Sequence, residues 1–309
     1  MTTTSIDQDH PWASFSKGPL QKISTSPGLP DYYVNRLDLL HSWTSGNKYY
    51  KLKYVIRQAL AEGVTTIVSK GGMFSNHLAA LSSTCKSFDI RLIAVIRSYK
   101  PDEKNPSIMR LRANGNEIIY LPSSDYNMFD NQEAKKLFPT AMFVPEGGLS
   151  ALGIRGAAEI PREFMEMKPT HVIIAGGTMS TACGVLSALP ASSKLIIVPA
   201  WKGCTVEYME DVIRKYKIEF AGEWELWPDY HFGGFGKFNS ELIDFICSYK
   251  ADFGVPLDPV YTGKLLFALT DKLNRRYFSE TDRVVAIHSG GLQGLEGYAY
   301  RFPEQWQEC

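Results

Sequence analysis

The chain has 309 residues, which is enough for one large domain or two domains of about 150 residues each. It is 44% hydrophobic and 21% charged, and its 33 basic residues balance 33 acidic ones. This balance gives no sign of binding to nucleic acid or an anionic membrane, and the longest clean apolar run, 92–96, is far shorter than the roughly 20 residues that span a bilayer.

Short β-branched runs alternate along the chain with segments of helical periodicity. The expected strands are 65–69, 91–97, 117–121, 171–175, 195–199 and 283–288. The expected helices cover about 52–60, 76–88, 107–114, 205–215, 240–250 and 263–275. The strand segments are apolar on both faces, as strands covered by helices on both sides should be. This alternation predicts an α/β fold with mainly parallel sheets.

Two regions between these elements have a different character. The stretch 138–156 separates two series of strands, is rich in Pro and Gly, and is expected to connect two domains. The segment 224–238 is aromatic and glycine-rich with little periodicity, and is expected to be a long loop. Five widely spaced cysteines include no CxxC pair, so no metal site is predicted. The first ten residues are polar and acidic, unlike a signal peptide, and we expect a cytoplasmic protein.

Three glycine clusters, at 69–77, 175–181 and 288–291, each follow an expected strand. Ligands of open α/β sheets bind beyond the carboxyl ends of strands, so the three clusters are expected to line one crevice. The second cluster carries hydroxyl side chains at a helix start, a pattern that can bind one phosphate, although a capped tight turn explains it equally well. It lacks the GxGxxG spacing and the acidic ribose contact of a nucleotide-binding dehydrogenase.

Lys48 and Lys51 lie three residues apart on one face of the first helical segment. An arbitrary lysine pair is most often a solvated basic surface. Here the pair accompanies a phosphate-type loop, and pyridoxal phosphate requires both an amine for its aldehyde and an anion site for its phosphate.

The chain resembles the 1-aminocyclopropane-1-carboxylate (ACC) deaminase and D-cysteine desulfhydrase family, pyridoxal-phosphate enzymes of the tryptophan-synthase-β fold type. Five motifs in order carry the resemblance: Gly-Asn-Lys-x-x-Lys-Leu at 46–52, Gly-Gly-x-x-Ser-Asn at 71–76, the glycine and hydroxyl loop at 176–181, Asp-Pro-Val-Tyr-Thr-Gly-Lys at 258–264 and His-Ser-Gly-Gly at 288–291. It implies a homodimer that acts on a small amino acid. On this fold, residues 1–53 and 157–309 are expected to form a larger cofactor-binding domain, and residues 54–156 a smaller α/β domain.

The resemblance also assigns roles to individual residues. It implies that Lys48 binds the cofactor aldehyde covalently, that Lys51 neutralises the phosphate, and that Ser75 and Tyr261 act on the substrate. Asn76 would hydrogen-bond the pyridine 3-hydroxyl, and Thr262 and Ser289 would flank the pyridine nitrogen. The other expected phosphate contacts are Gly177, Thr178, Met179, Ser180 and Thr181. His77 and Phe235 are expected in the substrate pocket, although His77 at a helix start is equally consistent with a cap or a core contact.

Two departures from the family pattern bear on the reaction. ACC deaminases carry Glu where this chain has Thr262 and an apolar residue where it has Ser289. A hydroxyl partner leaves the pyridine ring a weaker electron sink than a carboxylate does, and expelling a thiol demands less of that sink than opening a cyclopropane. The sequence therefore favours β-elimination of thiol from a small amino acid, such as D-cysteine, over ACC deamination. Phe235 stands where both branches usually have tyrosine, which leaves a cofactor-binding protein with little catalysis as a second alternative.

Overall fold

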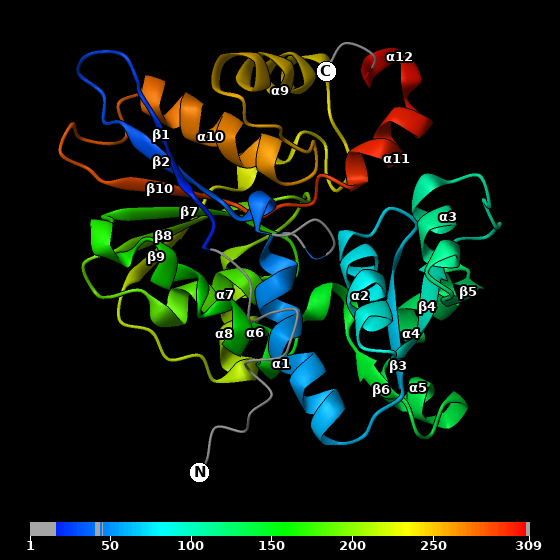
Figure 1. Cartoon of the computed structure of the whole chain (residues 1–309). Coiled ribbons are helices and arrows are strands. Elements are labelled where there is room, and N and C mark those ends of the chain that lie inside the picture. The colour runs from blue at the N-terminus through cyan, green and yellow to red at the C-terminus, as the bar shows by residue number, and fades with distance from the viewer. Residues whose placement is uncertain (1–16, 41–43, 45, 307–309) are drawn as a thin grey trace.

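The computed structural model describes residues 17–40, 44 and 46–306. The two ends of the larger expected domain, at 1–16 and 307–309, therefore lie outside the described residues. The described strands form a six-stranded sheet and a four-stranded sheet, which lie side by side with helices around each (Figure 1). The predicted α/β fold with mostly parallel sheets is confirmed.

The larger sheet has the strand order β1-β2-β10-β7-β8-β9. Its strands are β1 (Leu20–Ile23), β2 (Tyr32–Arg36), β7 (His171–Gly176), β8 (Lys194–Pro199), β9 (Glu223–Leu226) and β10 (Val284–His288). All neighbours pair in parallel except β1 and β2. Alternate residues of the central strands enter opposite cores: Val172 and Ile174 face one side, and Ile173 faces the other. This arrangement explains why these strands are apolar throughout.

Helices cover both faces of the larger sheet. One face packs against α6 (Ala151–Ala157), α7 (Ser180–Ala188) and α8 (Val206–Tyr216). The other packs against α9 (Ser240–Phe253) and α10 (Thr262–Asn274), which lie above the sheet in Figure 1. The chain ends in α11 (Gly294–Arg301) and α12 (Pro303–Trp306).

The smaller sheet is wholly parallel, with the order β5-β4-β3-β6. Its strands are β3 (Thr66–Gly72), β4 (Arg91–Arg97), β5 (Glu117–Leu121) and β6 (Met142–Val144). The surrounding helices are α2 (Asn76–Ser87), α3 (Pro106–Ala113), α4 (Ser123–Met128) and α5 (Asn131–Leu137). Since all four of these strands lie between residues 54 and 156, we propose these positions as the domain boundaries.

Helix α1 (Asn47–Ala61) connects the two sheets and contributes to the cores of both. Tyr49 and Tyr50 in its first turn pack in the core of the larger sheet. Leu52, Val55 and Ile56 pack with α2 in the core of the smaller sheet. The first turn of α1, which carries Lys48, is therefore anchored to the larger sheet, and the rest of the helix supports the smaller one.

Two sequence expectations need correction. The segment 224–238 is not a loop throughout, because β9 covers 223–226 and a 3-10 turn covers 228–231. The stretch 138–156 is not only a connection, because it contains β6 and the start of α6. These two strands are short edge strands, β9 beside β8 and β6 beside β3, so neither shows the doubly buried apolar run that marks a central strand.

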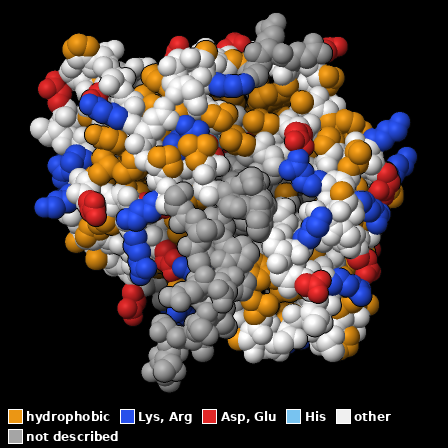
Figure 2. Space-filling view, in the orientation of Figure 1, with side chains coloured by type: hydrophobic (Ala, Val, Ile, Leu, Met, Phe, Trp, Pro, Cys, Tyr) orange, Lys and Arg blue, Asp and Glu red, His pale blue; other side chains and the backbone are white. Residues whose placement is uncertain are grey.

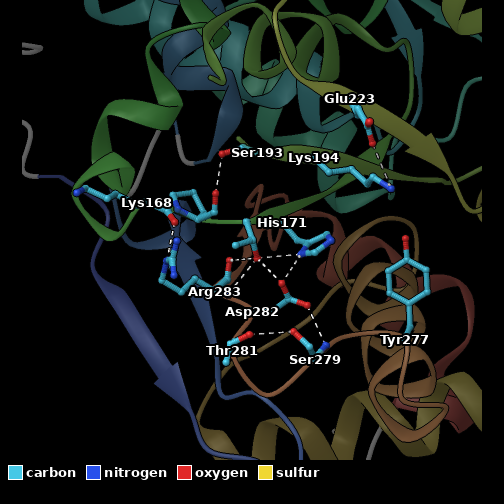
Figure 3. Close-up of polar contacts among 12 residues, drawn as sticks. Lys168, His171, Ser193, Lys194, Glu223, Tyr277, Ser279, Thr281, Asp282 and Arg283 are labelled. Atoms are coloured by element: carbon cyan, nitrogen blue, oxygen red, sulfur yellow. Dashed lines mark hydrogen bonds and ion pairs between the residues drawn. The ribbon is translucent and has the colours of Figure 1, made fainter. Parts of the chain in front are cut away.

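A group of polar side chains lies at the amino ends of the central strands β7 and β10 of the larger sheet (Figure 3). Thr170 Oγ1 hydrogen-bonds both His171 Nδ1 and Asp282 Oδ1 at 2.9 Å. Asp282 also accepts a bond from the backbone N–H of Ser279. This group connects β7 to the turn that precedes β10, at the edge of the sheet opposite the carboxyl ends of the strands.

The surface in Figure 2 carries interspersed basic and acidic side chains, consistent with the balanced net charge. None of the helices in the described residues combines the length and apolar character needed to cross a lipid bilayer.

Candidate active site

A cavity of about 850 Å³ lies where the carboxyl ends of strands from both sheets meet. Residues of all three glycine clusters line it: 72–77 after β3, 177–181 after β7 and 289–291 after β10. Arg97 at the end of β4, Glu146 after β6 and Trp201 after β8 complete this edge. The topology thus places the carboxyl ends of six strands around one cavity, as expected for ligand sites of open α/β sheets.

Lys48 is held by the first turn of α1 at the end of β10. The backbone N–H of Asn47 donates to Ser289 O at 3.1 Å, and Gly46 packs so closely there that a Cβ would lie 1.9 Å from Ser289 O. Lys48 Nζ donates to Asn47 Oδ1 at 2.8 Å, and Asn47 Nδ2 donates to Thr181 Oγ1 at 2.8 Å. Burial lowers the pKa of the Lys48 amine to about 8, against the opposing charge of Asp258.

Lys51 lies one turn further along α1 and is almost wholly buried. Burial and the nearby Lys48 lower the pKa of its amine well below the usual range. Within the described residues, neither amine forms an ion pair with a carboxylate. Two adjacent amines that no described carboxylate approaches to ion-pair distance favour an anion in this part of the cavity.

The loop 177–181 lies opposite these lysines and leads into α7. Met179 turns the chain with φ of 61°, a left-handed conformation that is rare outside glycine, and its side chain is buried in the core. The hydroxyl of Ser180, the first residue of α7, donates to Gly148 O at 3.3 Å. The loop therefore presents the unpaired N–H groups of a helix start to the cavity.

Ser75, Asn76 and His77 form the turn that begins α2. Ser75 Oγ accepts from the N–H of Leu78 and caps the helix. Asn76 Oδ1 is buried without a hydrogen-bond partner among the described residues, although its side chain borders the glycines of the 291–294 loop. All three residues line the cavity.

Tyr261 and Ser289 line the cavity, but Thr262 does not. Thr262 is fully buried, and its hydroxyl donates to Asp258 Oδ2 at 2.6 Å. Asp258 also accepts from the backbone N–H groups of Val260, Tyr261 and Thr262. Burial and the nearby Asp258 raise the pKa of the Tyr261 hydroxyl well above its usual value, so it stays protonated. Of the two residues whose hydroxyls are expected at the pyridine nitrogen, only Ser289 lines the cavity.

Phe235 lies at the mouth of the cavity, with its ring centroid 6.0 Å from that of Tyr261. Its side chain is 56% exposed. The buried amine of Lys264 holds this segment by donating to the carbonyl oxygens of Ala200, His231 and Gly234.

Sequence reasoning missed several residues at this site. Glu146 lines the cavity from the Pro-Glu-Gly-Gly turn after β6, and Trp201 lines it from the turn after β8. Asp258 and Lys264 stand in the motif at 258–264, but only the fold shows that one binds three backbone N–H groups and the other three carbonyls. For Trp201, the signal available in the sequence was its place directly after an expected strand.

A family model described as pyridoxal-phosphate dependent enzyme matches residues 18–290. Solved structures similar to this chain include that of an ACC deaminase homologue, with 23% identity, coverage of 96% of this chain and 99% of that chain, and a TM-score of 0.79. A hydrogen sulfide-producing enzyme from Fusobacterium nucleatum is 16% identical, with coverage of 95% and 99% and a TM-score of 0.67. Diaminopropionate ammonia lyase of Escherichia coli is 16% identical, with coverage of 96% and 87% and a TM-score of 0.68.

Proposed function

Because the chain belongs to the family of pyridoxal-phosphate-dependent enzymes, we propose that it is a lyase that eliminates a β-substituent from a small amino acid. We take D-cysteine as the representative substrate, with pyruvate, ammonia and sulfide as the products. The observation that carries this proposal is the place of Ser289, which lines the cavity beside the turn that holds Lys48.

The residues of the cavity fit the cofactor. Lys48 offers an amine for the aldehyde, and Lys51 with the loop 177–181 offers a site for the phosphate. The unpartnered, buried Asn76 Oδ1 marks a polar position that a ring hydroxyl would satisfy by donating to it. Gly177 packs against the Tyr261 ring, so that a Cβ there would lie only 3.2 Å from it. A flat aromatic group in the cavity therefore has polar partners available around its edge.

Pyridoxal phosphate supplies electron withdrawal that makes the Cα proton of a bound amino acid removable. A Lys48 amine with a pKa near 8 is in part unprotonated at neutral pH, so it can accept that proton at Nζ. The hydrogen bond from Lys48 to Asn47 fixes the direction of the amine. Ser75 and the free N–H groups at the start of α2 are placed to bind the substrate carboxylate.

Tyr261 is positioned to act on the leaving group. Burial raises the pKa of its hydroxyl, which is protonated at neutral pH, and its ring packs beside that of Phe235. A protonated phenol of this kind can donate a hydrogen bond to a departing thiolate. The Phe74, Phe238 and Tyr298 side chains also line the cavity and limit the access of water to the reacting atoms.

Deamination of ACC is the second candidate, and the likeness of the fold to an ACC deaminase homologue favours it. The hydroxyl of Ser289 argues against it, since a hydroxyl partner leaves the pyridine nitrogen largely unprotonated. A protein that binds the cofactor with little catalysis is the third candidate. It is favoured by Phe235, which offers a ring but no hydroxyl at the mouth of the cavity.

The test compares sulfide release from D-cysteine with 2-oxobutyrate formation from ACC, using protein loaded with pyridoxal phosphate. We expect sulfide without 2-oxobutyrate, and no sulfide from the Lys48→Ala variant. L-cysteine is the control for stereochemistry. Dominant formation of 2-oxobutyrate would overturn the argument from Ser289, and the absence of both products would favour the third candidate.

We also propose that the enzyme acts as a homodimer in the cytoplasm. Sedimentation of the purified protein tests the oligomeric state.

A further inference from the structure

His77 lines the cavity and has a buried ring nitrogen, Nδ1, without a hydrogen-bond partner in the part of the chain that the structure describes. The side chain is 2% exposed, and its Nδ1 has no hydrogen-bond partner among the described residues. A buried ring nitrogen without a partner costs free energy unless a ligand or a movable side chain satisfies it. The reaction proposed above gives this nitrogen no role.

The hydrogen bonds on the other side of the ring determine which nitrogen carries the proton. His77 Nε2 lies 2.9 Å from Ser69 Oγ, and the Ser69 hydroxyl donates its hydrogen to Val144 O at 2.7 Å. A hydroxyl has a single hydrogen, so Ser69 can only accept from His77, and Nε2 must carry the N–H. The Nδ1 atom of the neutral ring is therefore a lone-pair acceptor.

The ring stays neutral because of its surroundings. Burial lowers the pKa of His77 well below its usual value, and the amines of Lys48 and Lys51 lower it further. A second proton on Nδ1 would also place a third positive charge beside these two amines. An acceptor with a fixed tautomer is thus present across the usual pH range.

The side chain of Lys51 carries the hydrogen-bond donor that we match to this acceptor. A Cβ on Gly148 would lie 3.4 Å from Lys51 Cε and 3.8 Å from His77 Nδ1, so both groups border the same point in the cavity wall. Gly148 has φ of 70°, and its carbonyl oxygen accepts from Ser180 at the start of α7. Lys51, His77 and the phosphate-type loop therefore meet around Gly148.

We propose that His77 is a positioning residue for the phosphate site: when the phosphate binds, the Lys51 ammonium donates a hydrogen bond to His77 Nδ1, which directs that ammonium toward the phosphate. The inference rests on the phosphate placement proposed above. An ammonium has three N–H groups, so one bond to His77 leaves two for the phosphate oxygens. The acceptor also favours the charged form of a lysine that burial would otherwise neutralise.

The test measures cofactor binding rather than turnover. Dissociation constants of the apoprotein for pyridoxal 5′-phosphate and for pyridoxal, which lacks the phosphate, are obtained from quenching of tryptophan fluorescence, since Trp201 lines the cavity. We expect His77→Leu to weaken binding of pyridoxal phosphate by about ten-fold and to leave binding of pyridoxal unchanged. His77→Asn, which keeps an acceptor near the position of Nδ1, restores most of the affinity.

A double variant tests whether His77 acts through Lys51 or in another way. In a Lys51→Met protein, which itself binds pyridoxal phosphate less tightly, adding His77→Leu is expected to cause no further loss. Equal losses for both ligands, or an additive loss in the Lys51→Met background, would overturn the proposal. Unchanged binding of pyridoxal phosphate by Lys51→Met would overturn the phosphate placement as well. Because no reaction product is measured, failure of the proposed elimination leaves this comparison intact.

Discussion

Replacement of Lys264 by Met is expected to destabilise the protein by about 3 kcal/mol and to loosen the segment that carries Phe235. Lys264 is 1% exposed, and its amine lies 3.1 Å from Ala200 O, 2.8 Å from His231 O and 2.8 Å from Gly234 O. These bonds connect α10 to the turn after β8 and to the mouth of the cavity. Met retains the apolar stem but removes all three donors.

The magnitude follows from two opposing contributions. A hydrogen bond to a charged donor stabilises by about 2 kcal/mol, so three contribute about 6 kcal/mol. Met also relieves the desolvation of a buried ammonium, the effect that lowers the pKa of Lys264 to about 8, and this returns about 3 kcal/mol. The difference between the two contributions gives the expected loss.

Urea unfolding of the wild type and of Lys264→Met measures this loss as a lower midpoint with an unchanged slope. Lys135→Met on α5, where the lysine is exposed, is the matched control and is expected to shift stability by less than about 0.5 kcal/mol. Amide hydrogen exchange over 231–236 should accelerate in the Lys264 variant alone. A loss below about 1 kcal/mol, with unchanged exchange, would refute the idea that Lys264 holds this segment.

Three further predictions concern other parts of the molecule. Lys48→Ala is expected to lower kcat by about 10³-fold or more while circular dichroism stays native, and a near-normal rate would remove its assignment. Gly46→Ala should lower the free energy of unfolding, measured by thermal unfolding, by about 3 kcal/mol, because φ is 71° and the new Cβ would lie 1.9 Å from Ser289 O. Its control, Gly63→Ala, has φ of 66° and no atom near the new Cβ, and should lower it by about 1 kcal/mol. Burial lowers the pKa of His171, so the unfolded chain binds the extra proton and stability falls as pH drops below about 6.5. His171→Phe should flatten the dependence of unfolding free energy between pH 5.5 and 7.5, and an unchanged slope would contradict this.

The elements that the sequence predicted well are those whose pattern reflects burial on both sides. The central strands β4 and β8 are apolar between their terminal residues because each contacts a core on either face, and the expected bounds agree with the structure to within a residue. Strands β1 and β2 were missed because they lie toward one edge of the larger sheet and carry polar residues such as Gln21 and Asn35. Pairing partners, rather than local pattern, determine such strands.

For the candidate site, order along the chain was enough to bring the three glycine clusters to one edge. What the sequence could not provide was the direction of individual side chains. Thr262 and Ser289 are equivalent as hydroxyls in the motifs, yet one donates to Asp258 inside the fold and the other borders the cavity. The acceptor on His77 also depends on Ser69, eight residues earlier, and on the strand that places Val144 beside it.

Because α1 packs in the cores of both sheets, the chain cannot be divided within this helix without loss of core contacts. A fragment that begins at residue 54 would lack Leu52, which is fully buried in the core of the smaller sheet, and would cut α1 within the part that packs there. The smaller domain expressed alone would expose apolar surface where the first two turns of α1 normally lie, and it would be prone to aggregate. A separable version should therefore begin before Asn47 and carry polar substitutions at Tyr49 and Tyr50, whose rings would otherwise lose the core of the larger sheet.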